Sequence, residues 1–255
     1  MIKGIILAGG MGTRLNPLTK VTNKNLLPIY NKPMIYWPIK TLVESGIKDV
    51  LLVSGGNNVG SFLSTLGDGK ELGLRTLNYA YQKEPNGIAD ALSLAKEWVG
   101  DSPICVILGD NIFEHPVPKA IQSFTENPTG AQIFTYKSEN PECYGVAEVN
   151  ENNEVVSIVE KPSNPKSNLA VVGLYLYDKH IWEHINSLCP SWRGELEITD
   201  VNNQYILEGK LKANTIKGWW QDAGESIDTY LNTCIKVREF EQKTKQIHSE
   251  FPESP

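Results

Sequence analysis

Short apolar runs alternate with helical patterns through the first half of the chain. Four of these runs predict strands, at residues 5–7, 50–54, 76–81 and 104–108. Three segments between them repeat apolar residues at helical spacing, at residues 34–44, 59–66 and 88–99. Strands that are apolar along their whole length are buried on both faces. The pattern therefore predicts an α/β fold with a Rossmann-like, mixed but mainly parallel sheet and helices on both faces.

The second half mixes strands and helices less regularly. Predicted strands lie at residues 131–136, 145–149, 155–159 and 170–177. Predicted helices lie at residues 179–187, 198–208 and 226–245, and residues 249–255 are expected to fray. No repeat, linker or low-complexity block interrupts the pattern. We therefore expect residues 1–255 to form a single domain.

Glycine-rich or polar segments follow three of the predicted strands, at residues 9–14, 82–87 and 109–111. In a parallel sheet, ligands bind beyond the carboxyl ends of the strands. Glycine lets backbone N–H groups approach a polyanion closely, and Arg14 and Lys24 add positive charge. These features indicate a nucleoside triphosphate site. A plain strand-to-helix turn at residues 9–14 is the alternative interpretation.

Two better-known phosphate-binding loops do not match this segment. No Gly-Lys-Ser/Thr follows the glycines, so it is not a Walker loop. The final glycine of the dinucleotide fingerprint is missing as well, which argues against a dehydrogenase.

Composition and charge narrow the class of protein. The formal net charge of −6 excludes a general attraction to nucleic acid or to acidic membranes. No signal peptide precedes the first strand and no apolar run could span a bilayer, so we expect a cytoplasmic protein. The four cysteines have no Cys-x-x-Cys spacing and are expected to be buried free thiols.

Two aspartates stand in loops where a metal ion could be held. Asp110 directly follows the strand predicted at residues 104–108, and Asp222 lies in the polar turn at residues 219–224. Mg²⁺ between phosphates needs only one or two protein carboxylates, because phosphate and water complete its octahedron. Capping of a following turn or helix is the alternative role of each aspartate. We expect the two together to hold Mg²⁺.

A second charged group ends the strand predicted at residues 155–159. Neighbouring side chains on a strand point to opposite faces, so Glu160 and Lys161 face one ligand only if the chain twists there. Lys161 suits a phosphate monoester, Glu160 suits sugar hydroxyls, and Arg193 is a further candidate for the same phosphate. A solvated surface pair is the commoner fate of adjacent Glu and Lys.

Other catalytic arrangements receive less support. His180 and His184 have a spacing that can bind zinc, but no third ligand accompanies them, and we interpret both as surface residues. No Ser-His-Asp or Cys-His set stands out. Cations and carboxylates without a nucleophile are typical of phosphoryl-type transfer, which depends on positioning and charge neutralisation.

Seven motifs along the chain occur together in one family. The leading motif reads Leu-Ala-Gly-Gly-Met-Gly-Thr-Arg-Leu-Asn-Pro-Leu-Thr at residues 7–19. The others lie at residues 24–35, 108–113, 144–146, 159–162, 173–175 and 193–200. In this combination the chain resembles the sugar-1-phosphate nucleotidyltransferases over residues 3–244. Its motifs are most similar to the branch that uses dTTP and glucose 1-phosphate.

The resemblance implies a role for each motif. Residues 1–115 would form a nucleotide-binding half, residues 116–245 a sugar-phosphate-binding half, and residues 246–255 a tail. The nucleotide would be bound by Leu7, Ala8, Gly9, Gly10, Gly12, Thr13, Arg14, Gln82 and Gly87. The sugar phosphate would be bound by Asn111, Tyr144, Gly145, Glu160, Lys161, Val172 and Arg193. The catalytic residues would be Arg14, Lys24, Asp110 and Lys161, with Mg²⁺ as cofactor on Asp110 and Asp222.

The implied reaction is in-line transfer of a nucleotidyl group from dTTP to glucose 1-phosphate. Gln82 would read the pyrimidine edge, because an amide can pair with a ring N–H and a carbonyl at once. Use of UTP or of another hexose 1-phosphate stays open, since thymine and uracil differ by one methyl worth ~1 kcal/mol. A catalytically silent nucleotide-sugar sensor is an alternative of another class. The resemblance also suggests a homo-oligomer.

The chain departs from the longer members of the family in two places. Those members continue into C-terminal helices that help to form a regulatory nucleotide site. This chain stops at Pro255, so we expect inhibition by a downstream dTDP-sugar at that site to be absent. The loop at residues 219–225 keeps Asp222 but lacks the Asp-Thr-Gly form of the longer members.

Overall fold

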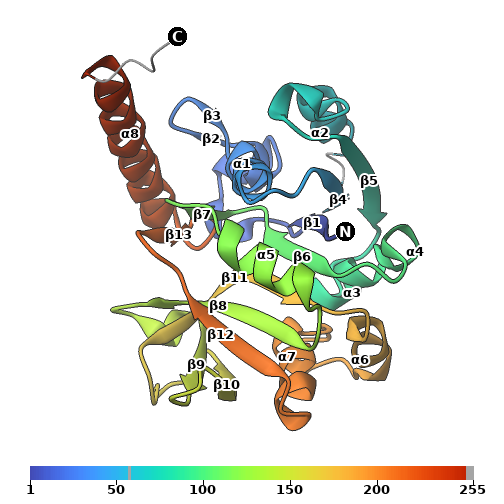
Figure 1. Ribbon diagram of the computed structural model, residues 1–255. Coiled ribbons are helices and arrows are strands. Elements are labelled where there is room, and N and C mark those ends of the chain that lie inside the picture. Colours follow the sequence, from blue (N-terminus) through green and yellow to red (C-terminus); the bar gives the residue numbers. More distant parts are fainter. Residues whose placement is uncertain (57–58, 251–255) are drawn as a thin grey trace.

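A nine-stranded mixed sheet runs through the computed structural model, which describes residues 1–56 and 59–250, with side chains to residue 244 (Figure 1). Its strands are β1 (Lys3–Ala8), β4 (Asp49–Gly55), β5 (Thr76–Gln82), β6 (Ile104–Leu108), β8 (Ala131–Lys137), β9 (Gly145–Val149), β10 (Val155–Glu160), β11 (Leu169–Tyr177) and β12 (Leu211–Thr215). Seven strands follow the order β10-β9-β11-β6-β1-β4-β5, and β8 and β12 branch from β11.

The two halves of the sheet differ in strand direction. β1 pairs in parallel with β4 and with β6, and β4 pairs in parallel with β5. β11 is antiparallel to β6, β8 and β9, and only β12 adds a parallel pair to this half. The carboxyl ends of the parallel strands therefore share one edge, which is where the glycine-rich segments emerge.

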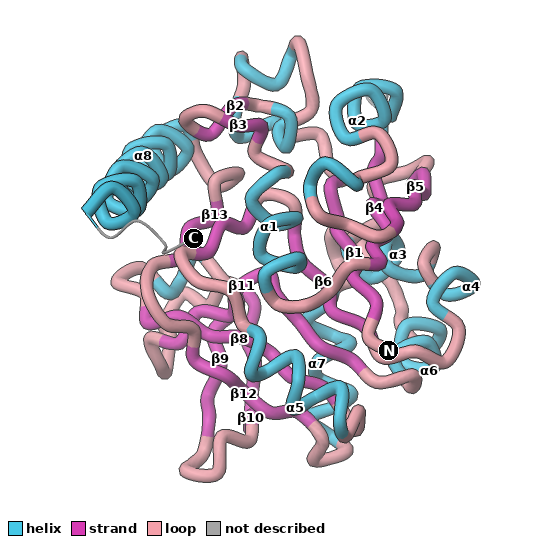
Figure 2. Tube along the Cα trace, turned by 45° about the horizontal axis from the view of Figure 1, so that its top comes forward, coloured by secondary structure: helices cyan, strands magenta, loops and turns pink. Residues whose placement is uncertain are grey.

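Helices cover both faces of this sheet, as the apolar pattern predicts. They are α1 (Tyr36–Glu44), α2 (Val59–Leu66), α3 (Ile88–Ser93), α4 (Lys96–Val99), α5 (Pro118–Glu126), α6 (Ile181–Ser187), α7 (Ile198–Leu207) and α8 (Ile227–Glu250). Side chains of α1, α2 and α5 pack in the core of one face, and those of α3, α6 and α7 in the core of the other (Figure 2). The α/β class with helices on both faces is thereby confirmed.

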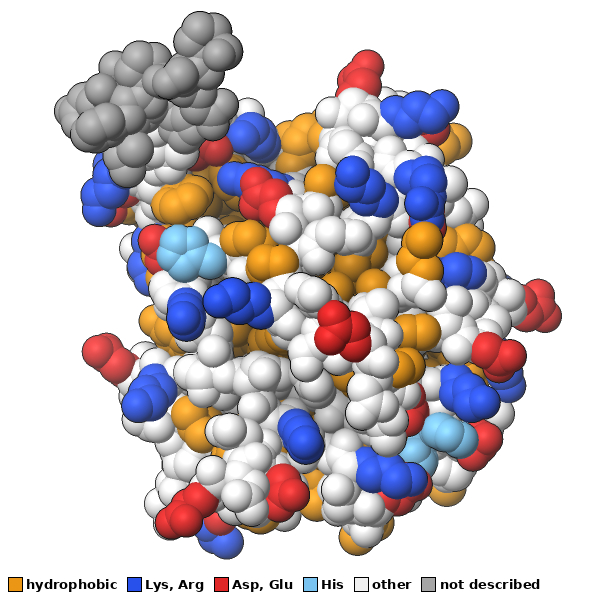
Figure 3. Space-filling model, in the orientation of Figure 1, with side chains coloured by type: hydrophobic (Ala, Val, Ile, Leu, Met, Phe, Trp, Pro, Cys, Tyr) orange, Lys and Arg blue, Asp and Glu red, His pale blue; other side chains and the backbone are white. Residues whose placement is uncertain are grey.

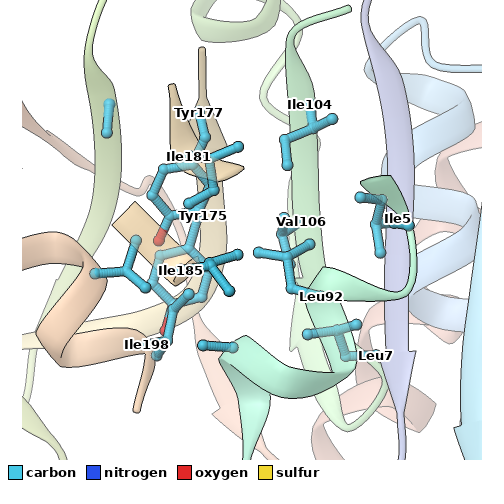
Figure 4. Close-up of a cluster of buried hydrophobic side chains, with 14 of the residues drawn as sticks. Ile5, Leu7, Leu92, Ile104, Val106, Tyr175, Tyr177, Ile181, Ile185 and Ile198 are labelled. Atoms are coloured by element: carbon cyan, nitrogen blue, oxygen red, sulfur yellow. The ribbon is translucent and has the colours of Figure 1, made fainter. Parts of the chain in front are cut away.

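Alternate residues of the central strand feed the two cores. Ile5 and Leu7 contact one layer, whereas Ile6 and Ala8 face the other, because successive strand side chains point oppositely. In Figure 4 Ile5 and Leu7 lie beside side chains of β6 and α3, and the same cluster continues beyond β6 into side chains of β11, α6 and α7. Burial on both faces fixes the register of β1, and with it the point where the chain leaves the sheet.

Two short strands outside the main sheet bring distant segments together. β7 (Asn111–Phe113) pairs antiparallel with β13 (Trp220–Asp222), so that Asp222 lies opposite Asn111. A second pair joins β2 (Pro28–Ile29) and β3 (Lys32–Pro33). The pairing of β7 with β13 places the two predicted metal ligands at one site.

The last helix leaves the body of the molecule and projects outward, in dark red at the upper left of Figure 1. Two contacts attach it to the β2–β3 segment: the Tyr230 hydroxyl donates to the Pro28 carbonyl at 2.6 Å, and Lys32 Nζ lies 3.0 Å from Glu241 Oε1. None of the helices within residues 1–56 and 59–250 is both long and apolar enough to cross a membrane. Basic and acidic side chains are interspersed over the face drawn in Figure 3.

Several expectations need correction. The helix predicted at residues 88–99 is two helices, α3 and α4. The Ser93 hydroxyl donates to the Asp90 carbonyl at 2.6 Å and so competes with the backbone hydrogen bonds that would continue the helix. The pattern also missed α5, β7, β12 and β13, which are short or half-polar. Fraying was expected at residues 249–255, and of these residues 251–255 lie outside the described part of the chain.

Two predictions about exposure are wrong in part. His184 is buried: its ring centroid lies 4.4 Å from that of Tyr205, and its Nε2 lies 3.4 Å from Glu208 Oε1. His184 lies on the apolar face of α6, so its ring points into the interior and packs against Tyr205. All four cysteines are free, but only Cys105 is buried, and Cys189 is exposed.

Candidate active site

The loop after β1 turns through two glycines in the left-handed region, with φ of 89° at Gly10 and 62° at Gly12. A Cβ on Gly12 would lie 2.9 Å from Thr19 Cγ2, so the loop also needs glycine for space. The Thr19 hydroxyl donates to the Gly12 carbonyl at 2.8 Å and fixes the turn. This loop forms one wall of a cavity of about 390 Å³.

The cavity gathers most of the residues predicted to bind a nucleotide. Those that line it are Leu7, Gly9, Gly10, Gly12, Thr13, Arg14, Gln82 and Gly87, and the predicted catalytic residues Lys24 and Asp110 line it as well. Ala8 does not, because its side chain is fully buried in the core behind the loop. Within the described part of the chain Arg14 makes no ion pair, so its guanidinium is available to a ligand.

Lys24 and Asp110 form the charged centre of this cavity, and Asp222 lies close to both. Lys24 Nζ donates a hydrogen bond to Asp110 Oδ2, and the Asn111 side-chain amide donates to Asp110 Oδ1 at 3.1 Å. Asp222 Oδ1 accepts from the Gly224 N–H at 2.9 Å. A Cβ on Gly224 would lie 2.5 Å from Asp110 Oδ2, so only glycine lets these segments meet.

The charges of this group alter one another's pKa values. Burial opposes the charge of Lys24, but the Asp110 and Asp222 carboxylates outweigh it and raise the Lys24 pKa. Burial likewise opposes ionisation of Asp110, and the Lys24 ammonium prevails and lowers the Asp110 pKa. Asp222 lacks such a close cation, so burial and then the Asp110 charge raise its pKa to about 7.

This donor set fits a hard divalent cation. Asp110 and Asp222 offer carboxylate oxygens on adjoining loops, and Asp222 remains short of a close counter-charge. In the described part of the chain, no group of three or more His, Cys, Asp or Glu residues could hold a metal by itself. Two carboxylates are what Mg²⁺ uses when substrate phosphates supply further ligands.

A second cavity of about 210 Å³ adjoins the first. Predicted sugar-phosphate residues in its wall are Asn111, Tyr144, Gly145, Glu160, Lys161 and Arg193. Both cavities are lined by Arg14, Ile88, Leu108, Arg193 and Glu195, so they are two compartments of one cleft. Val172 is an exception, because its side chain is buried in the core while Val171 and Gly173 face the cavity.

The backbone at Lys161 brings two neighbouring charges to one cavity. Lys161 has a φ of 45°, in the left-handed region that residues other than glycine rarely adopt. Its backbone N–H donates to the Tyr144 carbonyl at 3.0 Å. This twist lets Glu160 and Lys161 both line the cavity, although strand neighbours normally face opposite ways. Strained residues of this kind cluster at functional sites.

Arg193 is held in place by a carboxylate that the sequence analysis did not single out. Its Nη2 donates to both oxygens of Glu197 at 2.7 Å, and its Nε donates to Glu197 Oε1 at 3.0 Å. In the described part of the chain Nη1 makes no hydrogen bond or ion pair, and Arg193 lines the cavity, so this nitrogen is available to a ligand. Arg193 and Glu197 lie in the loop before α7, so no helical periodicity in the sequence indicates the pair.

Glu225 is a second missed residue. The Tyr144 hydroxyl donates to Glu225 Oε2 at 2.6 Å, and the Tyr144 ring meets the Trp220 ring edge-on at 5.1 Å between centroids. Both residues line the sugar-phosphate cavity. The position of Glu225, three residues after Asp222, is the only hint that the sequence offers.

The sequence pattern of the family described as nucleotidyl transferase matches residues 3–238.

The chain belongs to the nucleotidyl transferase family.

Relatives within the nucleotidyl transferase family are similar over most of their length. The glucose-1-phosphate thymidylyltransferase of Neisseria meningitidis is 45% identical over 226 residues, which are 88% of this chain and 78% of that protein. The enzyme of the same name from Mycobacterium tuberculosis is 41% identical over 245 residues, which are 95% and 84% of the two chains.

Solved structures of nucleotidyl transferases share the fold. A Bacillus anthracis protein described as a glucose-1-phosphate thymidylyltransferase, crystallised with a sucrose, has a TM-score of 0.88 and 43% identity, covering 93% of this chain and 96% of that one. A UDP-glucose pyrophosphorylase in complex with UDP-glucose has a TM-score of 0.80 and 27% identity, over 94% and 99% of the chains. The mixed sheet with its antiparallel second half is thus a fold that the family shares.

Proposed function

We propose that this nucleotidyl transferase is a glucose-1-phosphate thymidylyltransferase, which joins dTTP to α-D-glucose 1-phosphate and releases pyrophosphate. The observation that carries the proposal is one cleft with two compartments that share Arg14 and Arg193 and meet at a carboxylate pair. Such a cleft can hold two anionic substrates side by side. Similarity to the thymidylyltransferases supports the choice of substrates.

The nucleotide compartment has the groups that a triphosphate requires. Backbone N–H groups of the glycine loop, the Arg14 guanidinium and the Lys24 ammonium would contact the phosphates. Residues 1–115 are accordingly proposed as the nucleotide-binding half. Asp110 and Asp222 would hold Mg²⁺, which when bound neutralises phosphate charge.

The second compartment would hold the sugar phosphate. Lys161 and the free Nη1 edge of Arg193 face the phosphate, while Glu160 and Tyr144 offer an acceptor and an aromatic wall to the sugar. Residues 116–245 supply most of these groups and are proposed as the sugar-phosphate-binding half. Arg14, at the boundary of both compartments, reduces the repulsion between the two substrates.

The reaction then needs no covalent intermediate on the protein. A phosphate oxygen of glucose 1-phosphate attacks the α-phosphorus of dTTP, and the bond from that phosphorus to the pyrophosphate oxygen breaks. Pyrophosphate leaves opposite the attacking oxygen. Fixed cations on both sides lower the cost of the charge that develops, and holding both substrates removes much of the entropic barrier.

A pyrophosphate-release assay over dTTP, UTP, dCTP and ATP, each with several hexose 1-phosphates, tests the proposal. We expect the highest kcat/KM for dTTP with glucose 1-phosphate. Asp110→Asn should abolish Mg²⁺-dependent turnover and leave the fold intact, whereas Asp101→Asn, an exposed aspartate away from the cleft, should leave turnover unchanged. Release with UTP alone would favour the uridylyl alternative, and no release with any pair would favour a nucleotide-sugar sensor.

A homo-oligomer is part of the same proposal. Ile227, Leu231 and Ile235 recur every four residues on α8 and are 45%, 56% and 38% exposed. An exposed apolar stripe of this kind is typical of a surface that another chain covers. Sedimentation velocity measures the state directly, and a monomer at micromolar concentration would contradict this part of the proposal.

A further inference from the structure

Gln82 is the last residue of β5 and its side-chain amide is held by two acceptors. Its Nε2 donates to Asp90 Oδ2 at 2.7 Å and to the Gly87 carbonyl at 3.2 Å. A carboxylate and a carbonyl accept hydrogen bonds and cannot donate them. The amide therefore has a defined orientation, with its nitrogen toward α3 and its oxygen on the opposite side.

The Gln82 oxygen faces the nucleotide compartment. A Cβ built on Gly9 would lie 3.2 Å from Gln82 Oε1, and both residues line that compartment. Within residues 1–56 and 59–250, no hydrogen-bond donor contacts Oε1. Gln82 thus presents a single unpaired acceptor to a ligand, with both amide protons already used by the protein.

We propose that Asp90 is a specificity-determining positioning residue, which fixes the Gln82 amide so that the site selects nucleobases with a ring N–H. The inference rests on the proposed function and deepens it. Thymine and uracil carry a hydrogen on N3, which Oε1 can accept. Cytosine carries a lone pair there, which Oε1 repels.

Asp90 exerts this effect through Gln82 alone. Gln82 lines the nucleotide compartment and Asp90 does not, so Asp90 acts on the base through the amide that it holds. Rotation of the Gln82 amide by half a turn would present N–H groups to cytosine N3. That rotation would also set Oε1 against the Asp90 carboxylate and the Gly87 carbonyl, and two acceptors facing one another repel.

A purely structural role for Asp90 makes a different prediction. Asp90 lies in the first turn of α3, where a negative charge stabilises a helix by interaction with its dipole. Loss of that interaction would lower stability, and activity with every nucleotide would fall by the same factor. A change in the ratio between two nucleotides is therefore the diagnostic quantity.

The test compares dUTP with dCTP, which share the deoxyribose and differ only along the base edge. Wild type should prefer dUTP by about 100-fold in kcat/KM, the scale expected when a buried polar group is left without its partner. Asp90→Asn can both donate and accept, so it allows the Gln82 amide to turn. We expect it to reduce the preference about tenfold with the KM for glucose 1-phosphate unchanged.

Two further variants complete the design. Asp90→Glu keeps the acceptor and should retain most of the preference, and Asp101→Asn, the same change at an exposed site after α4, should behave as wild type. A folded Asp90→Asn protein with the wild-type ratio would overturn the inference, as would an equal loss with both nucleotides. If Asp90→Asn does not fold, Asp90→Ser takes its place with the same expected loss of preference.

Equilibrium binding separates the inference from the proposed function. Dissociation constants for dUTP and dCTP, measured by calorimetry without sugar phosphate, give the same preference whether or not turnover occurs. A wild-type protein that binds dUTP more tightly than dCTP but releases no pyrophosphate contradicts the proposed enzymatic activity and does not affect the inference about Asp90. An unchanged binding preference in Asp90→Asn contradicts the positioning role of Asp90 and does not affect the proposed enzymatic activity.

Discussion

Lys24 Nζ donates a hydrogen bond to Asp110 Oδ2, so a cation proposed for the triphosphate and a carboxylate proposed for Mg²⁺ neutralise each other. Both side chains are mostly buried, at 19% and 10% exposed. A buried charge without a partner is costly, and this pairing keeps the site stable before substrates arrive. It also means that a divalent cation must compete with the Lys24 ammonium for Asp110.

This competition predicts that Lys24→Gln strengthens metal binding while it weakens catalysis. Removal of the ammonium leaves Asp110 and Asp222 with more negative potential for a divalent ion. We expect Mn²⁺ to bind about tenfold more tightly to nucleotide-free Lys24→Gln at pH 8.5, by electron paramagnetic resonance. Turnover should fall by about 100-fold because a triphosphate contact is lost. Lys20→Gln, at an exposed position, is the control, and weaker Mn²⁺ binding in Lys24→Gln would contradict the competition.

The raised pKa of Asp222 predicts that Asp222→Asn, which removes the titratable carboxyl group, stabilises the protein more at high pH than at low pH. Burial and the Asp110 charge raise its pKa to about 7, well above the value of 3.8 expected in the unfolded chain. The folded state therefore holds a proton between these pH values that the unfolded state releases, and this contribution to stability is lost as pH rises through about 7. Asp222→Asn escapes that loss.

We therefore expect the stability advantage of Asp222→Asn over wild type to grow by about 2–3 kcal/mol between pH 5 and pH 8.5. Urea unfolding in EDTA measures it, because a bound metal would favour the wild-type carboxylate. Asp101→Asn should show no pH-dependent difference. An Asp222→Asn protein that loses stability relative to wild type as pH rises would refute the assigned pKa shift.

The hydrogen bond between Tyr144 and Glu225 predicts a selective effect on the sugar phosphate. Tyr144→Phe removes the hydroxyl that donates to Glu225 at 2.6 Å and leaves the carboxylate without that partner. We expect the KM for glucose 1-phosphate to rise about fivefold, with the KM for dTTP unchanged, from the loss of one charge-assisted hydrogen bond. Tyr136→Phe is the matched control. The Tyr136 ring also packs against Trp220, with 5.9 Å between ring centroids, but Tyr136 does not line the sugar-phosphate cavity. Equal KM values in both variants would show that the Tyr144 hydroxyl does not organise the site.

The parts of the fold that the sequence predicts are those with a strong local signal. The segment at residues 5–7 is apolar throughout, and it becomes the centre of β1 between two helix layers. Residues 59–66 form α2 with the predicted bounds. In contrast, β12 contains Lys212 and Asn214, which disfavour strands, and it forms because β8 offers a parallel partner. Such pairing is a tertiary effect that no local pattern contains.

The site divides in the same way. Arg14 and Asp110 follow apolar strands, so their place at the carboxyl edge is predictable from the order of the elements. The link from Asp90 to Gln82 is a side-chain contact across a turn, and the hold of Glu197 on Arg193 depends on a loop conformation. Their residue types are ordinary for helix ends and surface loops. Only the fold distinguishes them.

Gly87 predicts a large loss of stability on a small substitution. Its φ is 106°, and a Cβ would lie 2.5 Å from the Leu196 carbonyl oxygen and 2.7 Å from the Leu196 nitrogen. Those are backbone atoms joined to α3 by the Ala89 N–H, which donates to the Leu196 carbonyl at 3.1 Å, so they cannot move aside cheaply. The ψ of Gly87 is 174°, and this combination of φ and ψ is one that essentially only glycine adopts. Gly87→Ala should therefore cost about 2 kcal/mol of backbone strain and, in addition, about 2 kcal/mol for the clash.

Gly46→Ala measures the cost of a positive φ without a clash. Gly46 has a φ of 91°, and a Cβ there would have no atom within 4 Å. Urea unfolding should thus show a loss of about 1 kcal/mol for Gly46→Ala and about 4 kcal/mol for Gly87→Ala. Equal losses would mean that the loop at residues 82–87 relaxes away from Leu196. The close contact between the nucleotide compartment and the Arg193 loop would then not be a fixed part of the site.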